Sequence, residues 1–138
     1  MRFMMLMFPA NYCNAAPDAR PSVEDIERMM HFNYSLQQAG VLLALDGIHP
    51  PSSAVRVSSV DGKVRVVDGP FAEAKEVVGG YWVIDVTSRE EAVAWASRCP
   101  LSPGDTIEVR QVFEMADFSA DAQKAVEGLH HDLGQSVT

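Results

Sequence analysis

The sequence is poor in cysteine and in long apolar runs. Its 138 residues include only two cysteines, Cys13 and Cys99, which lie far apart and outside any Cys/His ligand spacing. We therefore expect idle thiols in a reducing cytoplasm rather than a disulfide framework. No apolar run reaches transmembrane length, and the short apolar start before Pro9 fits a buried strand better than a signal peptide.

Positive charge is also scarce, with 11 Lys and Arg against 19 Asp and Glu and a net charge of −8. Nucleic acids and anionic membranes repel such a chain, so we exclude both as partners. A glycine-rich phosphate loop, a nucleophile elbow and a zinc signature are missing too, so we expect no cofactor and no metal. The neighbouring His130 and His131 point to different helix faces, which favours a solvated tail over a metal site.

What is present is the composition of a single soluble domain, 47% hydrophobic and 22% charged. Capping boxes at Ser22 and Ser88 predict two helix starts, and Asp61-Gly62 predicts a two-residue hairpin turn between alternating valines. The patterns predict strands near 2–8, 41–46, 55–60, 63–68, 79–86 and 105–115, and helices near 23–39, 89–98 and 119–133.

This order is β-α-β, hairpin, β-α-β and a terminal helix. It predicts an α+β fold of the ferredoxin-like βαββαβ type, with helices on one face of an antiparallel sheet and an inserted β-hairpin. The stretches FMMLMF and YWVIDV are apolar on both strand faces and need a second cover. We therefore expect a homodimer that packs sheet against sheet.

The stretch VVDGPFAEAKEVVGG places a turn, a charged cluster and a glycine pair before a strand. Asp68 fits either a turn acceptor or a pocket carboxylate. Glu73, Lys75 and Glu76 fit a solvated surface. The alternative is that Lys75 holds a substrate carboxylate or, if it is buried, acts as a general base. The pair Gly79-Gly80 indicates a bulge or a close backbone approach.

Two further pairs carry chemistry. Asp46 and His49 lie at the end of the second strand. A carboxylate that orients an imidazole would make a proton-transfer pair there. Alternatively, His49 caps the turn at Pro50-Pro51. Glu108 and Arg110 share one side of the last strand. They fit either a cross-sheet ion pair or an arginine presented to an anionic ligand.

The stretches LLALDGIHPPSSAVRV, VVDGPFAEAKEVVGGYWVIDV, EEAVAWASRCP and IEVRQVFEMADF together resemble the DGPF-type branch of the YCII-related proteins. The resemblance covers residues 1–118 and leaves 119–138 as a C-terminal helical extension. It implies a small bacterial protein whose ferredoxin-like halves form a dimeric α/β barrel. It also implies gene neighbours that encode extracytoplasmic-function sigma factors, and a fold similar to that of muconolactone isomerases.

Shorter YCII-related proteins carry a helix-borne histidine paired with an aspartate. By spacing from Gly40, the resemblance puts that histidine near Met29 in this chain, and His31 is two residues away. Two residues turn a side chain through more than half a helical revolution, so an active site would need other residues here.

Two functions follow as hypotheses. The first is a cleft that binds a small anionic organic molecule and serves a cofactor-free isomerase or lyase. In it, the base is His49, oriented by Asp46 or Asp68, and the anion is held by Lys75 or Arg110. Glu73 is a further candidate for substrate binding. The second is a non-catalytic interaction or regulatory protein linked to a sigma factor, in which the charged motif residues are exposed.

Overall fold

The computed structural model describes residues 1–133, and residues 134–138 lie outside the described part. The chain is an α+β protein, and all of the predicted strands and helices are present. The last sheet strand ends at Gln111, earlier than predicted. The elements are β1 (Arg2–Phe8), α1 (Val23–Gln38), β2 (Leu42–Gly47), β3 (Val55–Val60), β4 (Lys63–Asp68), β5 (Gly80–Asp85), α2 (Arg89–Ala96), β6 (Thr106–Gln111) and α3 (Ala120–Leu133).

Local side-chain caps explain where the helices begin. The Ser22 hydroxyl accepts a hydrogen bond from the Asp25 amide at 3.1 Å, and the Ser88 hydroxyl accepts one from the Glu91 amide at 3.1 Å. The Glu91 carboxylate in turn accepts from the amide and the hydroxyl of Thr87, at 2.8 and 2.7 Å. Each cap satisfies amide groups that the first helical turn leaves unpaired, so both predicted helix starts are confirmed.

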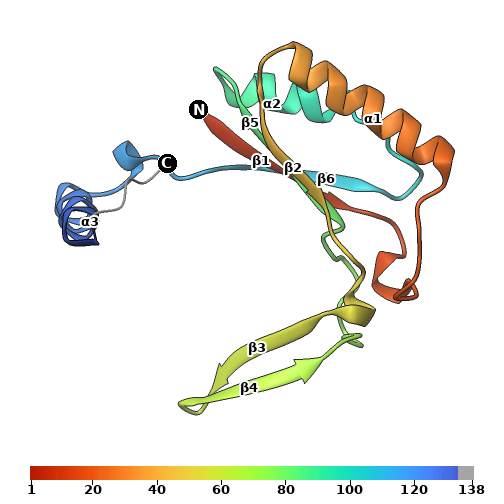
Figure 1. Cartoon of the computed structure of the whole chain (residues 1–138), viewed down its shortest axis with the longest axis horizontal. Helices are drawn as coiled ribbons and strands as arrows, with labels where there is room; N and C mark the ends of the chain where they lie inside the picture. Colours follow the sequence, from red (N-terminus) through yellow and green to blue (C-terminus); the bar gives the residue numbers. More distant parts are fainter. Residues whose placement is uncertain (134–138) are drawn as a thin grey trace.

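The four-stranded sheet has the order β2-β5-β1-β6, and all of its neighbouring strands are antiparallel. Figure 1 shows α1 and α2 on the same face of this sheet. Because side chains alternate along a strand, every second residue of β1 and β5 faces the helices and is buried. This core comprises Phe3, Met5, Met7, Phe32, Leu36, Val41, Trp82, Ile84, Val86, Ala92, Ala96 and Cys99.

The other face of the sheet has no helix on it. Met4, Leu6, Tyr81 and Val83 alternate with the core residues and are only partly buried. Within the described residues of one chain, the sheet stays open and does not close into a barrel. The predicted barrel involves a second copy, so it stays a prediction.

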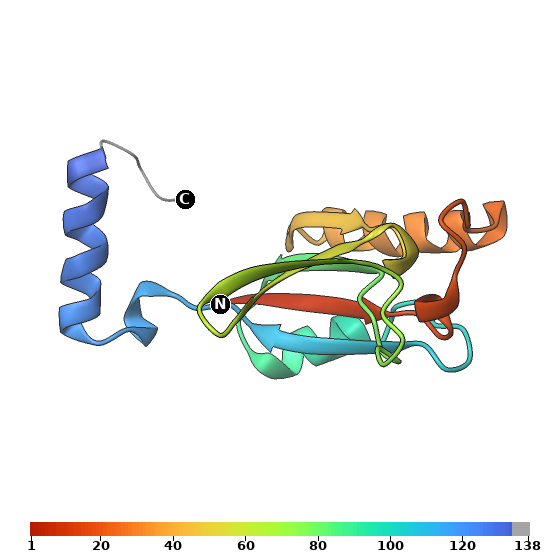
Figure 2. The same cartoon turned by 90° about the horizontal axis from the view of Figure 1, so that it is seen from below.

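Strands β3 and β4 form a separate two-stranded hairpin. Asp61 and Gly62 have φ of 51° and 77° at its tip, which confirms the predicted turn. In Figure 1 the hairpin lies below the sheet, on the side away from α1, and in Figure 2, seen from below, it crosses in front of the sheet. Both views show α3 beyond one end of the sheet. None of the helices in residues 1–133 combines the length and the apolar character needed to span a membrane.

Candidate functional site

A cleft of about 690 Å³ lies where the end of β2, the first half of α1 and the loop of residues 9–21 meet. Its volume falls in the range of small-molecule sites. The lining is mostly apolar and rich in methionine, with Met7 from β1, Met29 and Met30 from α1, and Ile48 after β2. Flexible, polarizable methionine side chains suit a pocket that adapts to the shape of an apolar ligand.

Gly79 joins the chain segments beside this cleft. Its amide donates to the Met7 carbonyl at 2.8 Å, and its carbonyl accepts from the Ile48 amide at 2.9 Å. A Cβ atom at Gly79 would lie 2.5 Å from Cγ of Pro9, closer than van der Waals contact allows. A Cβ atom at Gly80 would lie 3.0 Å from the Asp46 carbonyl oxygen, so the close backbone approach predicted for this glycine pair is confirmed.

Tyr12 anchors the loop of residues 9–21 to the end of β2. Its hydroxyl donates to the Ile48 carbonyl at 2.6 Å, and burial raises the pKa of this phenol. Nearby, the Ser52 hydroxyl donates to the Ala15 carbonyl at 2.9 Å. These contacts shape one wall of the cleft. No local pattern in the sequence marks Tyr12 as a site residue, because its partner lies 36 residues away along the chain.

The acids at the cleft already have partners. Asp25 pairs with Arg28 one helical turn along α1, and the hydrogen bonds from Arg28 and Ser22 lower the pKa of the Asp25 carboxyl. Asp105 accepts from the amides of Ala10 and Ser102, at 2.8 and 2.9 Å. Both carboxylates are therefore engaged in holding the local structure.

Two basic groups at the cleft lack such a partner. Arg20 donates to the Ala19 carbonyl at 3.2 Å, and no salt bridge among the described residues includes it. His49 lines the cleft and is exposed. With Asp25 and Asp105 engaged, the cleft offers an apolar wall with a guanidinium and an imidazole beside it.

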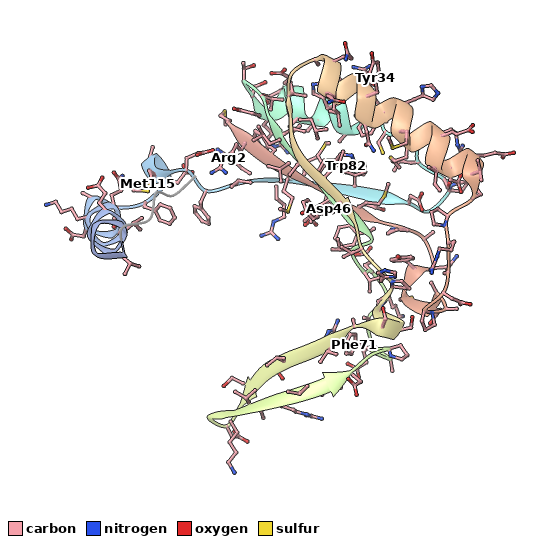
Figure 3. All side chains as sticks on the ribbon, viewed as in Figure 1. Arg2, Tyr34, Asp46, Phe71, Trp82 and Met115 are labelled. Atoms are coloured by element: carbon pink, nitrogen blue, oxygen red, sulfur yellow. The ribbon has the colours of Figure 1, made fainter. Side chains whose placement is uncertain are left out.

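Asn33 links the cleft to the core. Its side-chain oxygen accepts from the indole N–H of Trp82 at 2.8 Å, and the Trp82 ring packs edge-on against Phe32 with ring centroids 5.6 Å apart. Figure 3 shows Trp82 on the α1 side of the sheet. Met29 lines the cleft, whereas His31 is exposed and does not line it. Methionine thus occupies the helix position at which the resemblance implies a histidine.

Asp46 belongs to the other side of the sheet. Its carboxylate accepts from the Tyr81 hydroxyl at 2.7 Å, and this hydrogen bond raises the pKa of Tyr81. Figure 3 shows Asp46 on the side of β2 away from α1. It does not line the large cleft but a smaller hollow of about 160 Å³, and the two hollows share Met7, Met29, Asn33, Gly47 and Gly79. The structure does not bring Asp46 and His49 into a hydrogen bond, so their predicted pairing stays a prediction.

The DGPF turn is explained by close packing at the base of the hairpin. A Cβ atom at Gly69 would lie 1.9 Å from the Pro51 carbonyl oxygen, so a larger residue does not fit. The Arg56 guanidinium stacks on the Phe71 ring, 3.9 Å from its centroid, and Figure 3 shows Phe71 at this base. Asp68 ends β4 and lines neither hollow.

The predicted anion-binding residues lie elsewhere. Glu73 and Lys75 follow the turn, are exposed and line neither hollow. Glu108 and Arg110 are on the uncovered sheet face, opposite Leu6 and Met4 of β1. The salt bridges of the described residues do not include Arg110, so the expected ion pair with Glu108 is not observed.

No group of three or more His, Cys, Asp or Glu within the described residues is arranged to hold a metal ion. The side chains of His130, His131 and Asp132, which the sequence analysis assigned to a solvated tail, lie outside the described part of the structure.

The fold and the cleft define an α+β protein with one covered sheet face and an apolar site beside two basic groups. The family model of the YCII-related domain matches residues 1–116, and the chain therefore belongs to the YCII-related family. A similar protein from Rhizobium meliloti (strain 1021), "Uncharacterized protein R00369", is 35% identical over 79 residues. That match covers 54% of this chain and 64% of the relative, so the chain spans less than two thirds of it.

Proposed function

We propose that the large cleft binds a small organic anion whose body is mainly apolar. The observation that carries this proposal is the pairing of an apolar, methionine-rich wall with Arg20 and His49, while both nearby carboxylates are engaged. A guanidinium binds a carboxylate through two parallel hydrogen bonds, and the apolar wall removes the rest of the ligand from water. In this proposal Arg20 takes the anion-holding role that was predicted from the sequence for Lys75 or Arg110.

We propose His49 as the group that transfers a proton in a cofactor-free isomerase or lyase reaction. An imidazole is the side chain whose ordinary pKa lies closest to neutral pH. Among the residues that line the cleft, His49 is the one histidine. The orienting roles of Asp46 and Asp68 stay part of this proposal as predictions, since neither lines the same cleft.

The functional unit is proposed to be a homodimer in the DGPF-type branch, with ferredoxin-like halves that form an α/β barrel. The antiparallel order β2-β5-β1-β6, with two helices on one face, supports this arrangement. The partly buried Met4, Leu6 and Val83 on the other face support a sheet-to-sheet contact, because apolar surface of this kind is normally covered.

A second function, a non-catalytic interaction with a protein such as a sigma factor, is favoured by one observation. Glu73, Lys75 and Glu76 are exposed and line neither hollow, as expected for charges that meet a protein partner. Purified sigma factor should then bind the chain directly, and Lys75→Glu should weaken that binding. Undiminished binding by this variant would show that the charged cluster is not part of the contact.

The cleft is tested with a panel of aromatic and aliphatic carboxylates and their neutral amides. We expect carboxylates to raise the melting temperature and bind in calorimetry, and the matched amides to bind at least about tenfold more weakly. Arg20→Ala should abolish this preference, whereas Arg89→Ala, a matched exposed arginine on α2, should keep it. Loss of the preference in Arg110→Ala instead would place the anion on the uncovered sheet face and contradict the cleft.

The proposed chemistry is tested once a bound carboxylate is known. Exchange of its α-hydrogen with deuterium from solvent, followed by NMR, should be slowed by His49→Ala at least about a hundredfold, the usual contribution of a general base. His31→Ala, on the exposed face of α1, is the matched control and should exchange at the normal rate. Equal exchange rates in wild type and His49→Ala would remove His49 from the reaction.

A further inference from the structure

The β3–β4 hairpin has an apolar face that nothing in the described chain covers. The pairing of β3 with β4 puts Val57 opposite Val66, and Val55 and Val64 lie on the same face. Their exposed fractions are 56% for Val55, 68% for Val57, 74% for Val64 and 63% for Val66. The opposite face carries Arg56, Ser58, Lys63 and Arg65, together with the less exposed Val60 and Val67. The hairpin is therefore amphipathic, with the polarity of a strand pair that is buried on one side.

A hairpin of this kind needs a cover. Two-stranded hairpins are at best marginally stable in water, because one pair of strands has no second layer to pack against. The twelve strand residues of β3 and β4 are all exposed, and the two strands pair only with each other among the described residues. Residues 1–133 thus supply no second layer for this hairpin, which leaves its apolar face open to a contact from another molecule.

The position of the hairpin indicates what that cover is. Figures 1 and 2 place the hairpin on the side of the four-stranded sheet away from α1, where the uncovered face carries Met4, Leu6 and Val83. A protein seated on that face also meets the hairpin. One two-fold contact between identical copies would therefore cover the sheet face and both hairpins together.

The charge of the hairpin suits an acidic partner, and a second copy of this chain is such a partner. Residues 55–68 hold three cationic side chains and two carboxylates, so the hairpin is net positive, whereas the whole chain carries −8. Each hairpin thus has the sign opposite to that of the rest of the molecule. The positive hairpin of one copy is therefore attracted to the acidic body of the other.

We propose that the valine face of the hairpin, formed by Val55, Val57, Val64 and Val66, packs against a second copy of this chain. Each copy then extends its β3–β4 hairpin, called the arm below, over the surface of the other copy. This inference deepens the proposed homodimer and rests on it. It adds that the arm, and not the sheet face alone, holds the two copies together.

The test is sedimentation velocity of the full chain over a wide dilution series, with two variants. Val57→Glu with Val66→Lys replaces the valine face but leaves an opposite-charge pair across the hairpin, so the arm keeps its net charge. The control, Ser58→Gln with Val60→Gln, changes the other face and also leaves the net charge of the arm unchanged. We expect the valine-face variant to raise the dimer dissociation constant about a hundredfold, and the control to leave it within about threefold.

Each outcome separates the two claims. A wild-type chain that stays a single copy at every concentration overturns both the homodimer and the arm. A wild-type dimer that the valine-face variant leaves intact, or that the control variant disrupts equally, overturns the arm while the homodimer stands. If the valine-face variant unfolds, as judged by near-UV circular dichroism, Val57→Ala with Val66→Ala replaces it. Unchanged dimer affinity in this milder pair likewise overturns the arm.

Discussion

The sheet core and the hairpin are built from the same kind of sequence but end in different environments. In β5, Trp82 and Ile84 alternate with less buried residues and are 5% and 0% exposed. In β4, Val64 and Val66 alternate in the same way and are 74% and 63% exposed. Alternation therefore specifies which face of a strand is apolar, but it does not specify what covers that face. In β5 the cover is two helices of the same chain; for the hairpin we infer a second copy.

The largest contrast is expected from truncating one apolar residue in each region. Ile84→Ala removes a fully buried side chain and should lower the free energy of unfolding by about 2–5 kcal/mol. Val57→Ala should change it by less than about 0.5 kcal/mol when measured at high dilution, where two copies are apart. Urea unfolding followed by Trp fluorescence measures both. Equal losses in the two variants would contradict the distinction between a covered and an uncovered region.

A smaller effect is expected at the glycine beside the cleft. Gly79→Ala would bring a Cβ atom to 2.5 Å from the rigid Pro9 ring, and the resulting overpacking should cost about 1–3 kcal/mol of stability. Gly128→Ala, at a helical position where a Cβ atom meets nothing, is the matched control and should be neutral or slightly stabilising. Thermal unfolding compares the two. A Gly79→Ala protein as stable as its control would mean that the loop and strand ends are not closely packed.

The smallest effect is expected at the start of α2, where Glu91 accepts hydrogen bonds from Thr87. The hydrogen bonds from Thr87 lower the pKa of the Glu91 carboxyl below its ordinary value of 4.5. A lowered folded-state pKa gives stability that is present above the unfolded pKa, so it should be lost as the pH falls below about 4.5 through the folded value. Glu91→Gln should reduce this part of the pH dependence in urea titrations, and Glu90→Gln should not. Identical pH profiles for the two variants would show that Glu91 does not contribute to the pH dependence of stability.

How far the sequence predicts the molecule depends on how local each feature is. The caps at Ser22 and Ser88 and the turn at Asp61-Gly62 each depend on residues within a few positions, and all three are confirmed. The strand pattern also predicted both apolar faces of the sheet. Local chemistry was enough for these features, because propensity and alternation act over one or two turns of chain.

The cleft is a different case, because distant segments build it. Tyr12, Arg20 and Asn33 come from a loop and a helix that meet the end of β2 only in the folded chain. No spacing in the sequence marks them as neighbours. Glu73 and Lys75 stood out because they follow the DGPF turn, but the close packing at Gly69 explains that turn without them. Of the six predicted site residues, only His49 lines the large cleft.

The central claim, that a second copy covers the hairpin, is tested most directly by hydrogen exchange of the unmodified chain at high and low concentration. The amides of residues 55–68 should exchange slowly when the chain is concentrated and much faster on dilution, while those of β1 and β5 change little. Exchange of residues 55–68 at one and the same rate at both concentrations would contradict the claim.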